Sequence, residues 1–538
     1  MKAKFFIATL LIAGASLSMM AQGYKDGIEF YKIADYENAR VLLERNLDDA
    51  STNKSEAYYY LGMIALQQKD NALAKSYFDK GVAASPNYPY NYVGQGALAL
   101  KAGGDAKKLF DQARKLTKKD AKLEVAIARA YYNANPATYA KDIEKCIKQA
   151  RKYNQNDPDS YIFEADQYTD QMRWGDAAGN YELAYTLDPA NIEAYVKYAD
   201  TYYKENPDYA LDRLEEIIDK APNSALVQRQ LAEKLYEGGK LAKAAQRYGS
   251  YISGTKNHFP KDEARYCQLL LAAGEYAKCA EMAQKLKGTL PAGDPYQVVA
   301  DRLALYGFAA AKDWNNAAEA GRSLFADAGG NFEANDYVFY ARALDNIGDA
   351  AGAMAAYDKA VQLDPSNLDL IRGLAKSASA AGDFNKALTY GQKVLDATNR
   401  GADDLYDMAD VYFQNAKKLN GEEKTLALNG GLDYINEALG KDANNIAYLY
   451  RKALIEREKD TDTNTGNAVD TYLRLAQVVE TSPNRDELTA YLPVAYSYVG
   501  TYYVNSKRMA DAVAVFKKWL AIEPDNQSLK EFIQQFDK

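Results

Sequence analysis

A recurring order of small and aromatic residues constrains the fold of this 538-residue chain more than any other feature. Four segments, which begin at Tyr58, Tyr161, Tyr337 and Tyr496, place the same kinds of residue at the same offsets. The shared positions of the first segment are Tyr58, Gly62, Ala65, Ala74, Phe78, Gly81 and Pro86. Because the pattern recurs in register along the chain, we expect repeated units that bury their apolar faces against one another.

The spacing fits a unit of two antiparallel helices. Small residues such as Gly62 and Ala74 let two helices approach where they cross, and aromatic residues such as Phe78 fill the space between units. Pro86 would end the second helix because proline cannot donate the helical hydrogen bond. Gly348 and the residue after it supply a tight turn between helices. The sequence therefore predicts an all-α fold, an α-α superhelical solenoid of helix pairs.

This pattern resembles the tetratricopeptide repeat, which has a period of about 34 residues and the same order of aromatic, Leu-Gly, Tyr, Ala, Phe and Pro residues. Read in this way, residues 22–526 hold about thirteen or fourteen repeats. The resemblance implies that the first helices of the units line a concave groove. It also implies a protein that binds other proteins, without catalysis.

The first residues indicate an exported protein. Lys2 and Lys4 precede an apolar stretch that is too short for a membrane-spanning helix, which is typical of a signal peptide. We expect a signal peptide at 1–21 with cleavage after Ala21; cleavage after Ser18 stays open as the alternative. We also expect no transmembrane span and a location in the bacterial periplasm or at the outer membrane.

The regularity of the repeats varies along the chain. These differences divide the residues after the signal peptide into an N-terminal array at 22–253, divergent units at 254–335 and a C-terminal array at 336–526. The C-terminal array has polar insertions at 417–426 and 459–467, and a capping helix at 527–538 follows it. We expect a bend within 254–335.

The charge balance limits the partners. The chain has 66 Lys and Arg residues against 74 Asp and Glu residues, a net charge of -8, and no run of consecutive basic residues stands out. Phosphate neutralisation needs clustered basic residues. We therefore expect no nucleic-acid partner, and binding to an anionic membrane surface is disfavoured for the same reason.

Catalytic and metal-binding patterns are weak. The single histidine, His258, stands in a loop-like context, and neither a triad nor a multi-histidine metal centre can be built from it within one chain. No phosphate-binding glycine loop follows a strand. Asp460 and Asp462 resemble half of a calcium loop but lack its central Gly and closing Glu. We expect no enzyme, no cofactor and no metal. Cys267 and Cys279 either form a disulfide between two helices or are small buried residues, and both readings stay open.

Tyrosines are the first candidate binding residues, because the chain has 45 of them. Most occupy framework positions of the repeat, where they are expected in the core. Five tyrosines lie off the pattern and are predicted to project from first helices into the groove: Tyr59, Tyr88, Tyr203, Tyr406 and Tyr450.

Charged residues at groove positions are the second set of candidates. The middle of the groove is predicted to be acidic, with Asp159, Asp166, Asp170, Glu193 and Asp200. Further along lie four cations: Arg302, Arg342, Arg372 and Lys376. The resemblance extends in part to the carboxylate clamp of some family members, which Arg372 and Lys376 fit, whereas Val338 and Tyr306 stand where the clamp has Lys and Asn. These cations predict an acidic partner segment; the alternative is a solvated basic face.

Two functions follow from these features. The first is a protein–protein interaction scaffold in the cell envelope, which holds a partner segment in the concave groove. The alternative is the capture of a ligand or glycan at the cell surface or in the periplasm. The three tryptophans weigh against it, because Trp174, Trp314 and Trp519 stand at packing or turn positions.

Overall fold

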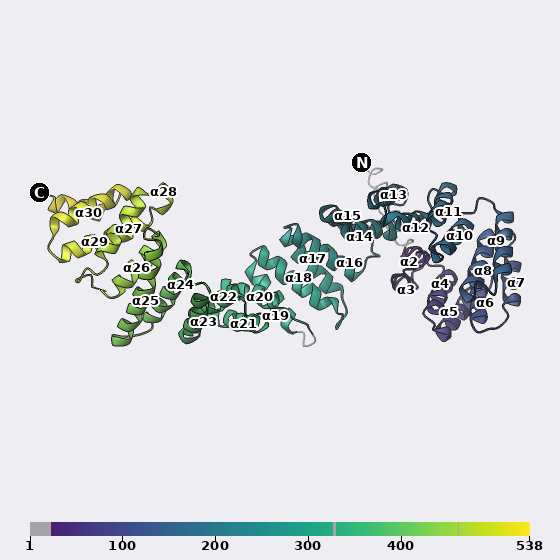
Figure 1. Ribbon diagram of the computed structural model, residues 1–538, viewed down its shortest axis with the longest axis horizontal. Helices are drawn as coiled ribbons and strands as arrows, with labels where there is room; N and C mark the ends of the chain where they lie inside the picture. The colour runs from purple at the N-terminus through teal and green to yellow at the C-terminus, as the bar shows by residue number, and fades with distance from the viewer. Residues whose placement is uncertain (1–22, 327–329, 461, 538) are drawn as a thin grey trace, which may run out of the picture. The chain divides into compact units, whose positions relative to one another are not determined.

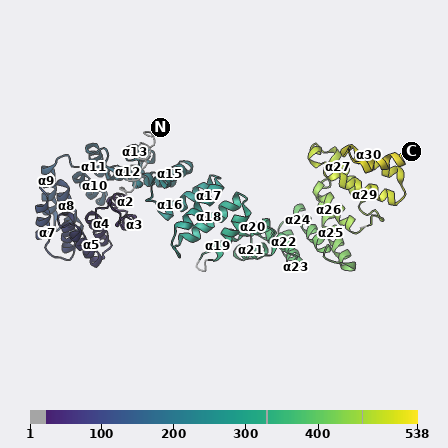
Figure 2. The same ribbon diagram turned by 180° about the vertical axis from the view of Figure 1, so that it is seen from behind.

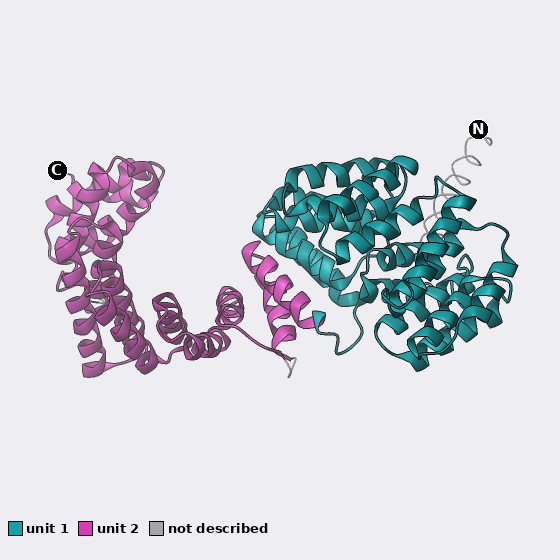
Figure 3. Cartoon of the chain, turned by 45° about the vertical axis from the view of Figure 1, so that its right-hand side comes forward, with its two compact units in different colours: residues 1–296 teal, residues 297–538 magenta. Residues whose placement is uncertain are grey.

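The computed structural model describes residues 23–326, 330–460 and 462–537. The predicted signal peptide at 1–21 lies outside these residues. The chain divides into two compact units, residues 1–296 and 297–538, which are coloured separately in Figure 3. This division falls within the stretch 254–335, where the repeat is least regular; the array boundaries given above stay predictions.

Antiparallel helices fill unit 1, as Figures 1 and 2 show. They are α2 (Gly23–Lys32), α3 (Tyr36–Arg45), α4 (Lys54–Gln67), α5 (Asn71–Ala84), α6 (Tyr90–Lys101), α7 (Lys107–Leu116), α8 (Ala121–Ala134), α9 (Ala140–Tyr153), α10 (Pro158–Asp170), α11 (Trp174–Leu187), α12 (Ile192–Tyr203), α13 (Pro207–Lys220), α14 (Ala225–Glu237), α15 (Leu241–Gly254), α16 (Pro260–Ala272) and α17 (Tyr276–Thr289).

Unit 2 continues the same alternation. Its helices are α18 (Tyr296–Ala310), α19 (Trp314–Ala326), α20 (Ala334–Asn346), α21 (Ala350–Leu363), α22 (Leu368–Ala381), α23 (Phe384–Ala397), α24 (Ala402–Ala416), α25 (Gly421–Lys441), α26 (Ile446–Glu458), α27 (Val469–Thr481), α28 (Arg485–Leu488), α29 (Tyr491–Asn505), α30 (Met509–Ile522) and α31 (Gln527–Phe536). No strand occurs in the described residues of either unit, so the predicted all-α solenoid is confirmed.

Local sequence explains where the helices begin and end. Asp70 begins α5, because its carboxylate accepts a hydrogen bond from the backbone N–H of Leu73 at 2.9 Å. The helix ends at Ala84, two residues before Pro86. At the predicted turn, Gly348 has a φ of +85°, a left-handed conformation that glycine adopts without strain, and Asp349 begins α21.

The small framework residues make room for aromatic rings. Phe78 is fully buried and lies against two glycines: a Cβ at Gly62 would meet its ring at 2.3 Å, and one at Gly94 would meet it at 2.2 Å. Gly62 lies on the first helix of the same unit, and Gly94 lies on the first helix of the next. The ring therefore joins two units, which is how the predicted framework holds the solenoid together.

Unit 1 contains a long-range contact that the repeat pattern does not predict. Its first helix, α2, packs on α12 and α14. Asp26 accepts hydrogen bonds from the side chain of Asn257 at 2.6 Å and from the backbone N–H of Ala225 at 3.4 Å, while Ser224 donates to Glu29 at 2.6 Å. Residues about 200 positions apart are thereby joined, and we call this contact the α2 clasp.

The predicted insertions have definite structures. Helix α25 begins at Gly421, inside the first of them. In the second, the Asp460 carboxylate accepts backbone N–H bonds from Asn464, Thr465 and Gly466 at 2.8–3.0 Å and a hydroxyl bond from Tyr498 at 2.7 Å. Burial would raise the pKa of Asp460, but these donors hold it well below its ordinary value. The Asp460 carboxylate therefore fixes the backbone of this loop and ties it to Tyr498 of α29.

Candidate functional site

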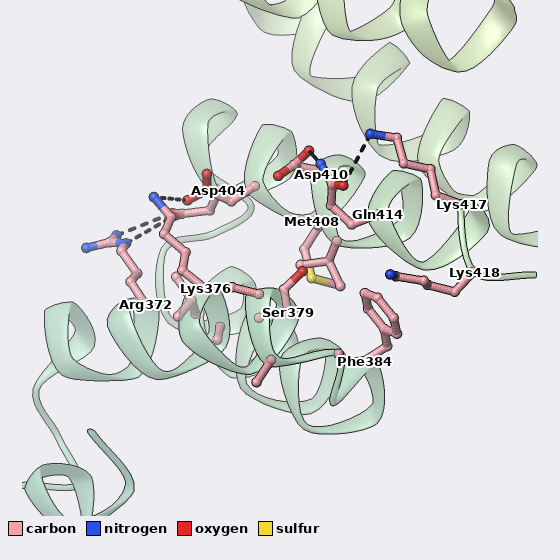
Figure 4. A pocket seen from close by; sticks show the side chains of 18 residues that line it. Arg372, Lys376, Ser379, Phe384, Asp404, Met408, Asp410, Gln414, Lys417 and Lys418 are labelled. Carbon is pink, nitrogen blue, oxygen red and sulfur yellow. Dashed lines mark hydrogen bonds and ion pairs between the residues drawn. The ribbon is translucent and has the colours of Figure 1, made fainter. Parts of the chain in front are cut away.

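A cavity of about 790 Å³ lies among α22, α23 and α24 of unit 2. Figure 4 shows side chains from these helices directed into one space. The apolar part of the lining includes Ala375, Phe384, Val394, Met408 and Val411, and the charged or polar part includes Arg372, Lys376, Ser379, Asp404, Asp407, Asp410, Gln414, Lys417 and Lys418. We call this cavity the α22–α24 pocket.

Helical spacing brings these side chains together. On α22, Arg372, Lys376 and Ser379 follow one another at four and three residues, so they share a face. On α24, Asp404 and Asp407 stand three positions apart. Asp404 lies 2.8 Å from Arg372 and Asp407 lies 3.0 Å from Lys376, so both acids meet that face. The two helices pack on one another and on α23, so the pocket is built on packed helices and not on loops.

Arg372 is held by two carboxylates. Its Nε donates to Asp404 Oδ1 at 2.8 Å, and its Nη1 donates to Asp369 at 2.8 Å. Lys376 Nζ lies 3.0 Å from Asp407. Burial, with Asp404 and Asp410 nearby, raises the pKa of Asp407, and Lys376 opposes that rise. Arg372 and Lys376 therefore both lie in the pocket, as predicted groove cations. Each of them is already paired with a carboxylate: Arg372 with Asp404 and Asp369, and Lys376 with Asp407.

The other end of the pocket, near the C-terminus of α24, carries Lys417 and Lys418. Lys417 donates to the side-chain oxygen of Gln414 at 3.3 Å. Lys418 is exposed and lines the pocket, and within the described part of the chain it makes no ion pair (Figure 4). Asp410 pairs with Arg451 of α26 at 2.8 Å. The lining thus carries cations at both ends. Within the described chain, Lys418 is the one among them whose side chain has neither a hydrogen bond nor an ion pair.

The other two predicted cations lie outside the pocket. Arg302 of α18 forms a two-point ion pair with the fully buried Asp336 of α20, at 2.8 and 2.9 Å, and Tyr306 donates to the same carboxylate at 2.7 Å. Arg342 is exposed, with its guanidinium 5.9 Å from the ring centre of Phe339. The structure therefore brings only two of the four predicted cations, Arg372 and Lys376, into one pocket.

The five predicted tyrosines are engaged in packing or hydrogen bonds. Tyr59 is buried, with the rings of Tyr60 and Tyr90 5.0 and 5.5 Å away. The half-buried Tyr88 lies 5.3 Å from Tyr90. Tyr203 donates to the carbonyl of Lys234 at 2.6 Å.

In unit 2, Tyr406 is stacked on Tyr448 at 5.5 Å, and Tyr450 meets Tyr491 edge-on at 5.0 Å. All five rings contribute to the packing of the repeats. They do not form a continuous exposed aromatic platform, because they are distributed over both units and Tyr59 is buried.

The predicted acidic middle of the groove is largely paired within unit 1. Lys197 lies 2.8 Å from Asp166 and 2.9 Å from Glu193, and Arg129 lies 2.6 Å from Asp166. Burial would raise the pKa values of both acids, but the neighbouring cations lower them below their ordinary values. Tyr132, on α8, donates to Asp170 at 2.8 Å. These carboxylates stabilise unit 1 and do not present a free acidic surface.

The sequence did not predict that acids line the pocket, or that the Lys418 side chain there has no ion pair within the described chain. Asp404, Asp407 and Asp410 recur every three residues along α24, which is a helical signal. The pairing of Asp404 and Asp407 with α22, and of Asp410 with α26, depends on the distance between successive first helices, which the structure supplies. Cys267 of α16 and Cys279 of α17 are both buried, and the structure forms no disulfide between them.

The fold and its framework define an α-helical repeat protein. The tetratricopeptide repeat family model matches residues 55–88 and 337–367, one segment in each unit. The chain is therefore a tetratricopeptide-repeat protein. No curated protein matches it.

Three solved structures illustrate what the chain is similar to. The first is the C-terminal part of a TPR repeat-containing protein from Cytophaga hutchinsonii, with 21% identity over 50% of this chain and 99% of that chain and a TM-score of 0.40. The second is YrrB, a TPR protein with an unusual peptide-binding site, with 15% identity over 39% of this chain and 98% of that chain and a TM-score of 0.31. The third is the APC/C hetero-tetramer Cut9-Hcn1, with 13% identity over 97% of this chain and 99% of that chain and a TM-score of 0.30. These likenesses concern the fold alone.

Among the residues that the structure describes, no helix has the length and apolar character needed to cross a membrane.

Proposed function

We propose that this chain is a non-catalytic interaction scaffold of the bacterial cell envelope and that it binds a segment of a partner protein in the α22–α24 pocket. The observation that carries the proposal is the pocket itself: its lining combines apolar side chains with cations at both ends, and it lies between the first helices α22 and α24 of successive repeats, with α23 packed beside them. Tetratricopeptide repeats present such faces to proteins and peptides, which supports a polypeptide ligand.

The apolar lining would supply most of the affinity. Burying one partner side chain against Met408, Phe384 and Val411 would contribute about 1.5–3 kcal/mol. An exposed ion pair contributes only about 0–1 kcal/mol. Lys418 is the cation best placed to meet a partner carboxylate, because Arg372 and Lys376 must share theirs with α24. The charges would therefore set orientation and salt dependence.

Location in the envelope rests on the first residues, whose charged and then apolar order is typical of export. The structure does not describe them. A fusion of residues 1–30 to a reporter that is active only after export would test the location. Reporter activity that disappears when the apolar stretch is interrupted by charge is the expected result; activity without the segment, or none with it, would contradict export.

The pocket is tested by affinity purification of the full chain from the envelope, with Lys418→Glu and Ser379→Glu as variants, since both side chains line the pocket without belonging to the buried core. Lys359→Glu is the matched control, because Lys359 is exposed on α21 and lies outside the pocket lining. We expect one reproducible partner that binds the wild type and the control, and binds both pocket variants at least tenfold less. Equal recovery with all four proteins would overturn the pocket as the binding site.

A further inference from the structure

The outer face of α9 carries four lysines in one stripe. Lys141, Lys145, Lys148 and Lys152 are all exposed, and at 100° per residue they fall within an arc of about 60°. Within the described chain none of them forms an ion pair. The stripe is about 16 Å long, from eleven residues at 1.5 Å each. We call it the lysine face of α9.

The lysine face borders a recess. Lys145, Lys148 and Lys152 line a hollow of about 710 Å³ together with Arg151 and Tyr161, between α9 and α10. Arg151 itself is paired with Glu164 at 2.7 Å, so the lysines are the free cations of this surface. The positive charge therefore lies beside a hollow that can receive side chains of a partner.

The outer face of α13 carries four acids at the same spacing. Asp208, Asp212, Glu215 and Asp219 are exposed, and they too stand at intervals of four, three and four residues. Asp208 pairs with Lys240, and Glu215 lies 3.5 Å from Arg247. Asp212 and Asp219 form no ion pair in the part of the chain that the structure describes. We call this stripe the acidic face of α13.

The two faces match in charge and in register. Helix α9 has five basic and two acidic residues, a net charge of +3, and α13 has five acidic and two basic residues, a net charge of -3. The intervals of four, three and four read the same in both directions. The four charges can therefore be opposed whether the two helices run parallel or antiparallel.

The two faces do not meet within unit 1. Helix α9 packs on α8 and α10, and α13 packs on α12 and α14. Figures 1 and 2 both show α11 between them. Two surfaces of this complementarity on one chain can be opposed only when a second copy is present.

We propose that the lysine face of α9 on one copy of this chain binds the acidic face of α13 on another. The contact joins two different surfaces, so it is heterologous: the first copy keeps a free acidic face and the second keeps a free lysine face. Association therefore extends beyond a pair, into open chains or closed rings. This self-association is independent of the α22–α24 pocket, which lies in unit 2.

The contact is weak and depends on salt. Exposed ion pairs contribute about 0.2–1 kcal/mol each, and their charges are screened beyond about 10 Å at 0.1 M ionic strength. Four such pairs support association at high protein concentration or when the chain is held on a surface. They do not support a permanent oligomer.

Charge swapping tests the proposal. The first variant, Lys141→Glu, Lys145→Glu, Lys148→Glu and Lys152→Glu, makes both faces acidic. The second, Asp208→Lys, Asp212→Lys, Glu215→Lys and Asp219→Lys, makes both faces basic. The control has four lysine-to-glutamate changes elsewhere, at exposed positions 80, 359, 393 and 530. Average mass is measured by light scattering at about 0.02 M and about 0.5 M ionic strength, after circular dichroism has shown that each protein is helical.

We expect the wild type and the control to associate at low ionic strength, at least in part, and to dissociate at high ionic strength. Each face variant alone stays monomeric, whereas their mixture associates, because its opposed faces differ in sign. A milder second variant, Asp212→Lys with Asp219→Lys, serves where the fourfold change unfolds the chain. A monomeric wild type at low ionic strength, or a mixture no larger than its components, would overturn the proposal. Binding of a monomeric wild type to anionic phospholipid vesicles through the same lysines would also overturn it and assign the face to a membrane.

Discussion

Raising the pH from about 4.5 to about 7.5 is expected to weaken the α2 clasp through Asp26. This carboxylate is only 2% exposed. Its burial raises its pKa to about 6 from an ordinary value of 3.8, although Asn257 and the N–H of Ala225 lower it. Because the pKa is raised in the closed state, the carboxyl group stabilises the clasp fully below pH 4. That contribution is lost as the pH rises through 6.

The magnitude follows from the two pKa values. A shift from 3.8 to about 6 corresponds to about 3 kcal/mol in all, of which about 2 kcal/mol is lost between pH 4.5 and pH 7.5. Burial also raises the pKa of Glu29, to about 7, so this second group acts in the same direction and over a slightly higher range. The clasp should therefore open more readily at neutral pH than at mildly acidic pH.

Hydrogen exchange of the α2 amides measures this opening directly. In Asp26→Asn the group is uncharged at every pH, so comparison with the wild type at the same pH removes the intrinsic pH dependence of exchange. We expect protection of α2 in the variant, relative to the wild type, to rise about 30-fold between pH 4.5 and pH 7.5. Asp48→Asn is the control, since the Asp48 side chain is 96% exposed. A ratio that does not change with pH would refute the reasoning.

Three further predictions concern the framework. Phe78→Ala removes the ring that joins Gly62 and Gly94 and should lower the free energy of unfolding of unit 1 by about 3–5 kcal/mol, measured by denaturant titration. Asp460→Ala should lower the unfolding temperature of unit 2 and expose its loop to proteolysis, since three backbone donors of the loop and the hydroxyl of the buried Tyr498 lose their acceptor; an unchanged cleavage pattern would contradict this role. Arg302→Ala leaves Asp336 buried without its cation and should cost about 3–5 kcal/mol, whereas Arg342→Ala should change stability by less than about 0.5 kcal/mol. Equal losses would show that Arg302 is not a buried partner.

The repeat framework could be predicted from the sequence because it is local. In the four clearest segments the small residue, the aromatic residue and the closing proline stand at fixed offsets, and helix geometry brings Phe78 against Gly62. The turn at Gly348 follows from the same spacing. Fold class therefore depends on contacts within a unit and between neighbouring units.

The charges of the groove could be predicted only in part. Repeat position places Arg372 and Lys376 on a first helix, but Asp404 and Asp407, which pair with them, come from α24, the first helix of the next unit. Pairing between units depends on the rise and twist of the solenoid, which the spacing within one repeat does not contain. The same reason explains why Asp166 and Glu193 form a paired cluster instead of an acidic surface.

Two features of unit 1, the α2 clasp and the lysine face of α9, could not be predicted from the repeat pattern. The α2 clasp joins Asp26 to Asn257, and no repeat offset relates the two. The lysine face of α9 was hidden for a different reason: its members are separated by two or three residues, so no consecutive basic run exists. Reading the helix at 3.6 residues per turn brings them together.

Photo-crosslinking from inside the α22–α24 pocket tests the proposed function most directly. A photoreactive residue at Ser379, which lines the pocket, is compared in cells with one at Lys359, which is exposed outside it. We expect Ser379 to crosslink to one envelope protein and Lys359 to give none of that product, with the product lost when Lys418→Glu is added. No crosslinked protein from Ser379, or the same products from both positions, would contradict a partner-binding pocket in unit 2.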